Sequence, residues 1–303
     1  MKPFPKNARV CFIGDSITHN NGYISHISAY YHENLKENNV SFYNCGVAGG
    51  RTSTILSIFD EDVLSHKPTH AVIMLGVNDS NRSFLLKPRT KERYDSLVNS
   101  FNEYKKNLAE LCGKLKENNV EITLCTITPY NEYCDSEVSV VSGCYALTAG
   151  YAEYIRQYAK ECGFGLCDYH TYITEQMQGA DIYRPDRTHP NDEGQYLIAK
   201  CFLKTQGLEI SESRELPEYM QKWCENVSLL RDIRATEWLV IQDYSLSDEE
   251  RIKFIEKFVS EEHEPNEYLE YFMELSHIYL DAKPRQKALE EETNRLMEIE
   301  FKK

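Results

Sequence analysis

Short apolar runs alternate with longer amphipathic stretches over the first two thirds of the chain. The short runs have the length of β-strands, and they lie at residues 9–13, 40–43, 70–75, 121–126 and 164–167. The longer stretches repeat apolar residues at helical spacing, and they lie at residues 23–38, 52–64, 94–118, 147–162 and 191–204. Strands that alternate with helices predict a parallel sheet covered on both faces, which is the doubly wound α/β class.

The run at residues 70–75 is the most apolar of these, so we expect it to be a central strand, buried on both faces of the sheet. In sheets of this class, ligands bind outside the carboxyl ends of the strands. Polar residues that directly follow the apolar runs are therefore the first candidates for chemistry.

Both the pattern and the composition change after residue 205. All 14 glycines lie at or before Gly207. The segment after residue 205 contains 24 acidic and 13 basic residues, a net charge of −11 within a total of −14. A shift of this kind is typical of a domain boundary. We therefore predict an α/β domain at residues 1–205 and a C-terminal extension at residues 206–303.

The C-terminal extension has the features of packed helices. Ser247 and Glu250 form a capping-box sequence ahead of apolar residues at helical spacing. A second apolar stripe runs from Tyr268 to Tyr279. Three prolines fit the first turns of helices, and they are Pro217, Pro265 and Pro284. We predict three or four helices that pack on the α/β domain or across a dimer, because such stripes need a surface to cover.

The overall charge argues against two classes of partner. With 48 acidic and 34 basic residues, the chain lacks the basic surplus that nucleic acids and anionic membranes attract. Its longest apolar runs are strand-sized, far short of a membrane span, and the N-terminus shows no secretion signal. The 10 cysteines are scattered, without a Cys-x-x-Cys pair, which is typical of reduced thiols in the cytoplasm. We expect a soluble cytoplasmic protein without a metal or other cofactor.

Three polar motifs follow the first three apolar runs. Ser16 ends a Gly-Asp-Ser sequence, at a point where a helix N-terminus could meet developing negative charge. A glycine-rich loop at residues 44–52 permits close approach of the backbone. Asn78 follows the central run, and its amide can donate to an oxyanion, which a carboxylate cannot do. Each motif alone is more typical of an ordinary turn.

A fourth motif supplies a candidate base. Asp186 lies three residues before His189, a spacing at which the carboxylate can bind the Nδ1–H of the imidazole and leave Nε2 free. Pro190 and Asn191 then begin a helix that would fix the histidine. Of the nine histidines, we take His189 as the candidate base and expect the other eight to be ordinary surface or core residues.

In this order, the four motifs resemble the blocks of the SGNH hydrolase superfamily, also called the GDSL esterase/lipase family. Those blocks read Gly-Asp-Ser, Asn-x-Gly-x-x-Gly, Gly-x-Asn-Asp and Asp-x-x-His-Pro, and the resemblance covers residues 8–205. It implies a flavodoxin-like three-layer α/β/α fold with a parallel sheet, and a site that hydrolyses acyl esters. It does not extend into the C-terminal extension.

The resemblance also implies roles for individual residues. Ser16 would be the nucleophile, His189 the general base and Asp186 the residue that orients the base. The oxyanion donors would be the backbone N–H groups of Ser16 and Gly49 and the side-chain amide of Asn78. Many family members have Gly-Asp where this chain has two glycines, so the choice of Gly49 depends on its position alone.

Two loops, at residues 128–145 and 181–187, are expected to rim the site. Their tyrosines could stack on a sugar ring or pack the loops, and they are Tyr130, Tyr133, Tyr145 and Tyr183. Arg187 could place a positive charge at the mouth of the pocket and so favour an anionic substrate, although we favour a solvent-facing arginine. Our candidate substrate-binding residues are Tyr130, Tyr183 and Arg187.

Together these features predict a metal-independent serine esterase that cleaves short acyl esters through an acyl-enzyme. Acetyl esters of carbohydrates are the favoured substrates, and this part follows from the resemblance alone. One alternative is a thioesterase or lysophospholipase for longer acyl chains, which a wide apolar groove would favour. Another is a catalytically silent ligand-binding module, against which the complete motif set argues. The C-terminal helices could in addition join two copies into a homo-oligomer.

Overall fold

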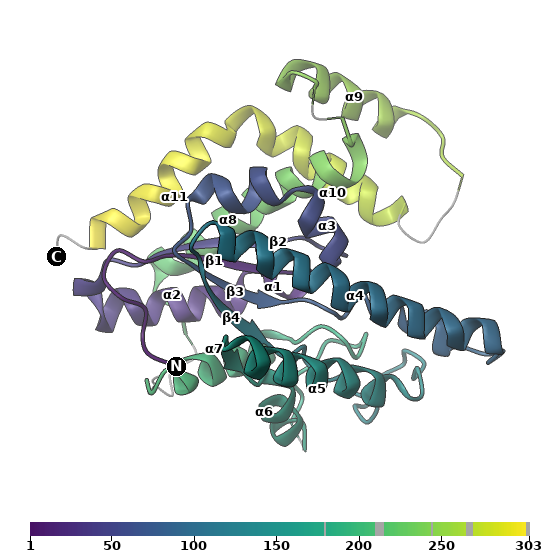
Figure 1. The fold of residues 1–303 in the computed structure, drawn as a ribbon. Coiled ribbons are helices and arrows are strands. Elements are labelled where there is room, and N and C mark those ends of the chain that lie inside the picture. The colour runs from purple at the N-terminus through teal and green to yellow at the C-terminus, as the bar shows by residue number, and fades with distance from the viewer. Residues whose placement is uncertain (179, 210–214, 244, 265–268, 301–303) are drawn as a thin grey trace. The chain divides into compact units, whose positions relative to one another are not determined.

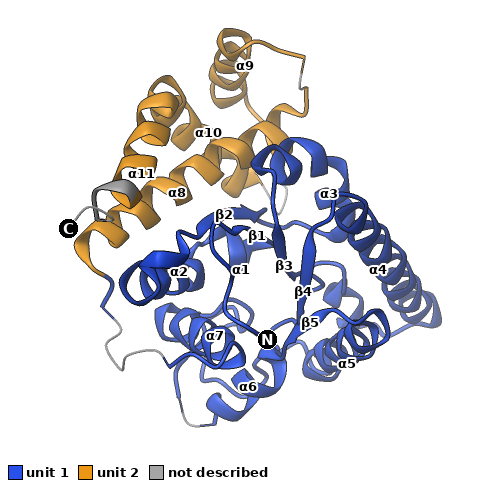
Figure 2. Cartoon of the chain, turned by 60° about the vertical axis from the view of Figure 1, so that its left-hand side comes forward, with its two compact units in different colours: residues 1–216 blue, residues 217–303 orange. Residues whose placement is uncertain are grey.

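The computed structural model describes residues 1–178, 180–209, 215–243, 245–264 and 269–300, with side chains up to Met297. The chain divides into two compact units, Met1–Leu216 and Pro217–Lys303 (Figure 2). The first unit extends beyond residue 205, where the composition changes, because Gln206 is buried and accepts a hydrogen bond from the Tyr31 hydroxyl at 2.9 Å. The functional division into residues 1–205 and 206–303 stays a prediction.

A five-stranded parallel sheet forms the centre of the first unit (Figure 1). The strands follow the order β2-β1-β3-β4-β5, which is the flavodoxin-like order. They are β1 (Arg9–Gly14), β2 (Ser41–Gly46), β3 (His70–Met74), β4 (Glu121–Cys125) and β5 (Gly165–Cys167). Each lies on a run of the sequence that predicts a strand, so the parallel α/β sheet is confirmed.

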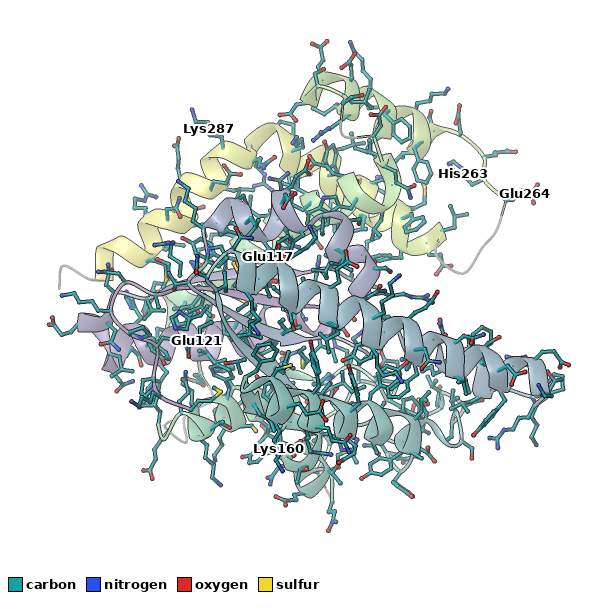
Figure 3. All side chains as sticks on the ribbon, in the orientation of Figure 1. Glu117, Glu121, Lys160, His263, Glu264 and Lys287 are labelled. Carbon is teal, nitrogen blue, oxygen red and sulfur yellow. The ribbon has the colours of Figure 1, made fainter. Side chains whose placement is uncertain are left out.

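Helices cover both faces of this sheet, as a three-layer fold requires. Helices α2 and α7 lie on one face, and α3, α4 and α5 lie on the other (Figure 2). Charged side chains such as Glu117 and Lys160 point away from the core (Figure 3). The helices of this unit are α1 (Ser16–His19), α2 (Gly22–Asn34), α3 (Thr52–Ser57), α4 (Lys91–Glu117), α5 (Cys144–Cys162), α6 (Tyr169–Gln176) and α7 (Asp192–Thr205).

The strand register brings the predicted motifs to one edge. In the parallel ladders, Gly14 at the end of β1 pairs with Gly46 of β2 and with Met74 of β3. Three neighbouring strands therefore end at the same level, with β1 in the middle. The chain segments that leave these ends are the ones that contain Ser16, Gly49 and Asn78.

Two helical segments differ from the sequence prediction. The helix expected at residues 52–64 is α-helical only to Ser57 and continues as a wider turn at Phe59–Val63 and a 3-10 turn at Leu64–His66. Phe59 and Val63 are nevertheless buried, so the irregular turns keep the apolar side chains on the core. Helix α6 was not predicted, because eight residues are too few to show a helical period.

Four α-helices lie in the described part of the second unit, which confirms the helical prediction. They are α8 (Glu218–Thr236), α9 (Asp248–Ser260), α10 (Leu269–Ala282) and α11 (Gln286–Glu300). Ile233, Ile255 and Tyr279 belong to the apolar core of this unit. The expected capping box is present, with Ser247 and Glu250 bonded to each other's backbone. On α11, Lys287 points outward (Figure 3).

The predictions for the prolines have different outcomes. Pro217 is the N-cap residue of α8, and Pro284 lies in the turn Lys283–Arg285 ahead of α11. Pro265 and Tyr268 lie outside the described residues. Within the part of the chain that the structure describes, no helix is both long enough and apolar enough to cross a membrane.

Candidate active site

Ser16 occupies the turn from β1 into α1. Gly14 is required there, because a Cβ atom on this residue would lie 2.0 Å from Thr18 Oγ1. Asp15 is the N-cap of α1, and its Oδ1 accepts the backbone N–H of Ile17 at 3.0 Å. The turn therefore presents Ser16 at the carboxyl end of the middle strand, where it is half-buried.

Ser16, His189 and Asp186 form a continuous chain of hydrogen bonds. Ser16 Oγ lies 2.6 Å from His189 Nε2, and His189 Nδ1 lies 2.5 Å from Asp186 Oδ2. The side chains of His189 and Asp186 are 33% and 43% exposed, so solvent and a substrate can reach the chain of bonds. A serine that shares a hydrogen bond with an oriented imidazole is the geometry of an activated nucleophile.

Backbone groups hold Asp186 in the carboxylate form. Its Oδ1 accepts the N–H groups of Thr188 and His189, both at 2.9 Å. Burial alone would raise the pKa of Asp186, but the bonds from the His189 side chain and from these backbone groups hold it well below its usual value. An ionised Asp186 keeps the Nδ1 proton on the imidazole and leaves Nε2 to accept a proton from Ser16.

The 181–191 loop carries both Asp186 and His189. The backbone N–H of Arg184 donates to the His189 carbonyl at 2.7 Å, and that of Asn191 donates to the Ile182 carbonyl at 3.1 Å. The Asn191 side chain also caps α7 by accepting the N–H of Gly194 at 3.0 Å. The loop is thus closed on itself and tied to a helix, which explains why His189 has a fixed position.

Gly49 lies in the loop after β2, and Asn78 lies in the loop after β3. Gly49 has a φ of +70°, a conformation that glycine adopts without strain. One amide hydrogen of Asn78 is donated to the carbonyl of Gly50 at 3.0 Å. A primary amide has two hydrogens, so Asn78 retains a donor for a ligand.

More than half of the sequence matches a known family. The model of the GDSL-like lipase/acylhydrolase family matches residues 12–197, more than half of the chain. The chain belongs to this family. It is a carboxylic ester hydrolase, and the matched residues include Ser16, Asn78 and His189.

Individual relatives of this GDSL-family enzyme agree with that membership. An acetylxylan esterase of Geobacillus stearothermophilus is 26% identical over 229 residues, which are 68% of this chain and 97% of the relative. A solved catalytic mutant of the acetylxylan esterase Axe2 from the same organism has 24% identity and a TM-score of 0.58, over 70% of this chain and 100% of that one. BT4096, a gut microbial diltiazem-metabolizing enzyme, has 16% identity and a TM-score of 0.80, over 100% of this chain and 96% of that one. The two structures show a shared fold.

Other polar residues of the GDSL-family enzyme connect the turns that carry the site residues through hydrogen bonds. Asp79 accepts the backbone N–H and the hydroxyl of Thr52, at 3.1 and 2.5 Å, and so ties the start of α3 to the loop after β3. Burial raises the pKa of Asp79, and the bonds from Thr52 offset part of this rise. Asn44 donates to the Thr18 carbonyl at 2.9 Å and accepts the N–H of Gly46 at 2.8 Å. Asn44 and Asp79 belong to two of the sequence motifs, but their structural roles were not predicted. The hydrogen bonds of a side chain inside a turn leave no periodic signal in the sequence.

The structure places the three candidate substrate-binding residues inside the loops. Tyr130, Tyr183 and Arg187 are only 4–5% exposed. The Tyr183 hydroxyl donates to the Pro129 carbonyl at 2.5 Å, and the Tyr130 hydroxyl accepts the N–H of Val141 at 3.2 Å. These contacts favour loop packing over substrate contact for both tyrosines.

The structure corrects the predicted exposure of Arg187. A solvent-facing arginine was expected, but its guanidinium donates to the carbonyls of Cys134, Ser136 and Val138 at 2.7, 3.2 and 2.9 Å. Backbone carbonyls turned toward the interior need hydrogen-bond donors, and the guanidinium supplies several from one side chain. Its charge is therefore used inside the protein and not at the mouth of a pocket.

Proposed function

We propose that this enzyme hydrolyses short acyl esters of carbohydrates, acetyl esters above all, with Ser16 as nucleophile, His189 as general base and Asp186 as the residue that orients the base. The observation that carries the proposal is the unbroken chain of hydrogen bonds from Ser16 through His189 to Asp186. The carboxylate and the serine lie on opposite nitrogens of one imidazole, which is the arrangement that proton transfer during acyl transfer requires.

The reaction has two halves. Ser16 Oγ attacks the acyl carbon while His189 Nε2 takes its proton, and the resulting oxyanion receives hydrogen bonds from Asn78 and from the N–H groups of Ser16 and Gly49. The tetrahedral intermediate collapses, and His189 returns the proton to the leaving alcohol. Water, deprotonated by His189, then attacks the acyl-enzyme, and collapse of the second intermediate releases the acid and restores the Ser16 hydroxyl.

Two observations favour an acetylated carbohydrate as the substrate. The acetylxylan esterase relative aligns over nearly its whole length with this chain. A cavity at the start of the 181–191 loop has a mixed lining, in which polar side chains and tyrosines such as Asn131, Tyr133 and Thr174 stand beside Met177 and Ala180. A long acyl chain, as in the thioesterase or lysophospholipase alternative, would require an apolar lining there.

The test is a substrate panel assayed with the wild type and with Ser16→Ala. We expect hydrolysis of p-nitrophenyl acetate and of acetylated xylo-oligosaccharides, slower hydrolysis of p-nitrophenyl octanoate, and a loss of about 10³-fold or more in Ser16→Ala. Ser96→Ala, on α4, is the matched control and should retain wild-type rates. Octanoate hydrolysed faster than acetate would favour the longer-chain alternative. An unchanged rate in Ser16→Ala would remove Ser16 as nucleophile.

A further inference from the structure

A cavity of about 710 Å³ lies beside the 181–191 loop. We call it the loop cavity, and its walls include Asn131, Tyr133, Asp135, Tyr145, Thr174 and Asp181. These residues come from the loop after β4, the start of α5, the end of α6 and the segment before the triad histidine (Figure 1). The volume is within the range of sites that bind small molecules.

The lining of the loop cavity is suited to a neutral, polyhydroxylated ligand. Tyr133 lines the cavity and is 83% exposed as a residue, so it is accessible to a ligand. Tyr145 contributes a second ring, and its hydroxyl lies 3.5 Å from Thr174 Oγ1. Asp135 and Asp181 supply carboxylate acceptors, and no lysine or arginine is among the described lining residues. Tyrosine rings offer an apolar face with a polar end, whereas the two carboxylates disfavour an anion.

The wall that carries Tyr133 is fixed before any ligand arrives. Asn131 Oδ1 accepts the backbone N–H groups of Tyr133 and Cys134, both at 3.0 Å. Glu132 Oε1 accepts the N–H groups of Gly143 and Tyr145, at 3.0 and 2.8 Å, and so joins the two ends of the loop. A site whose backbone is already ordered binds without the entropic cost of ordering it.

Hydrogen bonds join the loop that lines the cavity to the segment that carries Asp186 and His189. The backbone N–H of Asn131 donates to the carbonyl of Arg187, the residue that follows Asp186, at 2.9 Å. Ser136 Oγ donates to the Pro185 carbonyl at 2.5 Å. Asp181 lies on the cavity wall, and its backbone carbonyl accepts a hydrogen bond from the side-chain amide of Asn191 at 3.0 Å. The loop after β4, which lines the cavity, and the segment that carries Asp186 and His189 are therefore joined by direct hydrogen bonds.

We infer that the loop cavity binds a neutral sugar unit in the alcohol part of the substrate, next to the unit whose ester is cleaved, with Tyr133 and Tyr145 packing against the sugar ring. This inference rests on the proposed function for its substrate class. It assigns substrate contact to the two tyrosines of these loops that remain accessible, in place of the buried Tyr130 and Tyr183.

Steady-state kinetics of Tyr133→Ala test the inference. The loss of one ring contact should lower kcat/KM for acetylated xylotriose about five- to tenfold, mainly through KM. The rate on p-nitrophenyl acetate, which has no sugar to place in the cavity, should stay within about twofold of wild type. Tyr133→Trp should retain the wild-type preference. Tyr94→Ala is the matched control, because Tyr94 is an exposed tyrosine on α4, outside the cavity lining.

Equal losses on both substrates would show a structural role for Tyr133 and overturn the inference, as would no loss on either. A binding measurement keeps this result separate from the proposed function. Calorimetric titration of unacetylated xylotriose into Ser16→Ala should show weaker binding when Tyr133→Ala is added. This readout needs no turnover, so it tests the cavity even if neither ester is hydrolysed. Equal affinity in the two proteins, or no binding to Ser16→Ala, would overturn the inference.

Discussion

Asp15 is the most heavily desolvated carboxyl group beside the nucleophile. It is 1% exposed, and while its Oδ1 caps α1, its Oδ2 has no hydrogen-bond partner in the structure. Burial raises the pKa of Asp15 to about 6, although the N–H of Ile17 and the charge of His189 offset part of the rise. The folded protein therefore keeps this group protonated up to about pH 6.

This shift predicts that Asp15→Asn stabilises the protein at high pH but not at low pH. The pKa of Asp15 is about 6 in the folded state and about 3.8 in the unfolded state. The stabilising contribution of the protonated group to the free energy of unfolding is therefore fully present below pH 3.8 and is lost as the pH rises through 6. Asparagine keeps the cap and does not ionise. Relative to wild type, Asp15→Asn should gain up to about 3 kcal/mol of unfolding free energy between pH 4 and pH 8.

Urea unfolding of both proteins at the two pH values measures this gain. Asp60→Asn is the control, because it makes the same replacement at an exposed aspartate outside the site. A difference between Asp15→Asn and wild type that is independent of pH would contradict the assignment of a raised pKa to Asp15.

Asn78 allows a second test at the residue scale. A donor aimed at the oxyanion is stronger in the transition state than in the bound ester, so Asn78→Ala should lower kcat by about 10²–10³ while KM changes little. The variant also loses the bond to the Gly50 carbonyl, which should cost about 1 kcal/mol of stability. Kinetics and a thermal melt on one preparation separate the two effects.

The neighbouring Asn81 supplies the control for this experiment. Its amide donates to Ser100 Oγ at 2.7 Å and accepts from Arg51 at 2.8 Å, so Asn81→Ala should lose stability and keep its turnover per folded molecule. If Asn78→Ala behaves like Asn81→Ala, Asn78 is a turn residue and not an oxyanion donor.

At the scale of elements, the strands were predictable and the loop interiors were not. A buried parallel strand such as β3 is a continuous apolar run, so the polar motif that follows it, which contains Asn78, can be located from the sequence. The burial of Arg187 depends on which carbonyls the loop after β4 turns inward, and those contacts join residues about 50 apart in the sequence. No local pattern contains that information. The same holds for α3, whose irregular end follows the packing of Phe59.

The loop after β4 should depend on Arg187. Lysine keeps the charge but cannot reach several carbonyls with one planar group, so Arg187→Lys should lose roughly 2–3 kcal/mol of unfolding free energy. Residues 131–138 should also become more susceptible to limited proteolysis. Arg184→Lys is the matched control, because Arg184 is exposed on the same loop as Arg187. Equal stability and equal cleavage in the two variants would show that Arg187 does not hold the loop.

At the scale of the whole molecule, the chain consists of two compact units, and the relatives match different shares of it. The acetylxylan esterase relative aligns over 97% of its length with only 68% of this chain, so its fold is complete without a counterpart of the remainder. BT4096 aligns with 100% of this chain, so the helical unit recurs in a second structure. Every residue of the candidate site lies in Met1–Leu216. The second unit has a core of its own and a buried ion pair, between Glu237 and Lys283 at 2.8 Å.

This separation predicts that a chain ending at Leu216 keeps the chemistry. The sheet, the helices that cover it and the hydrogen bonds among Ser16, His189 and Asp186 all lie within the first unit, so kcat on p-nitrophenyl acetate should stay within about twofold of the full chain. Circular dichroism and a thermal melt establish first that the shortened chain is folded. Ser16→Ala in the same background then establishes that the remaining rate belongs to the site. A shortened chain that melts cooperatively at the temperature of the full chain, yet has lost turnover, would show that the helical unit contributes to catalysis and that the site is incomplete without it.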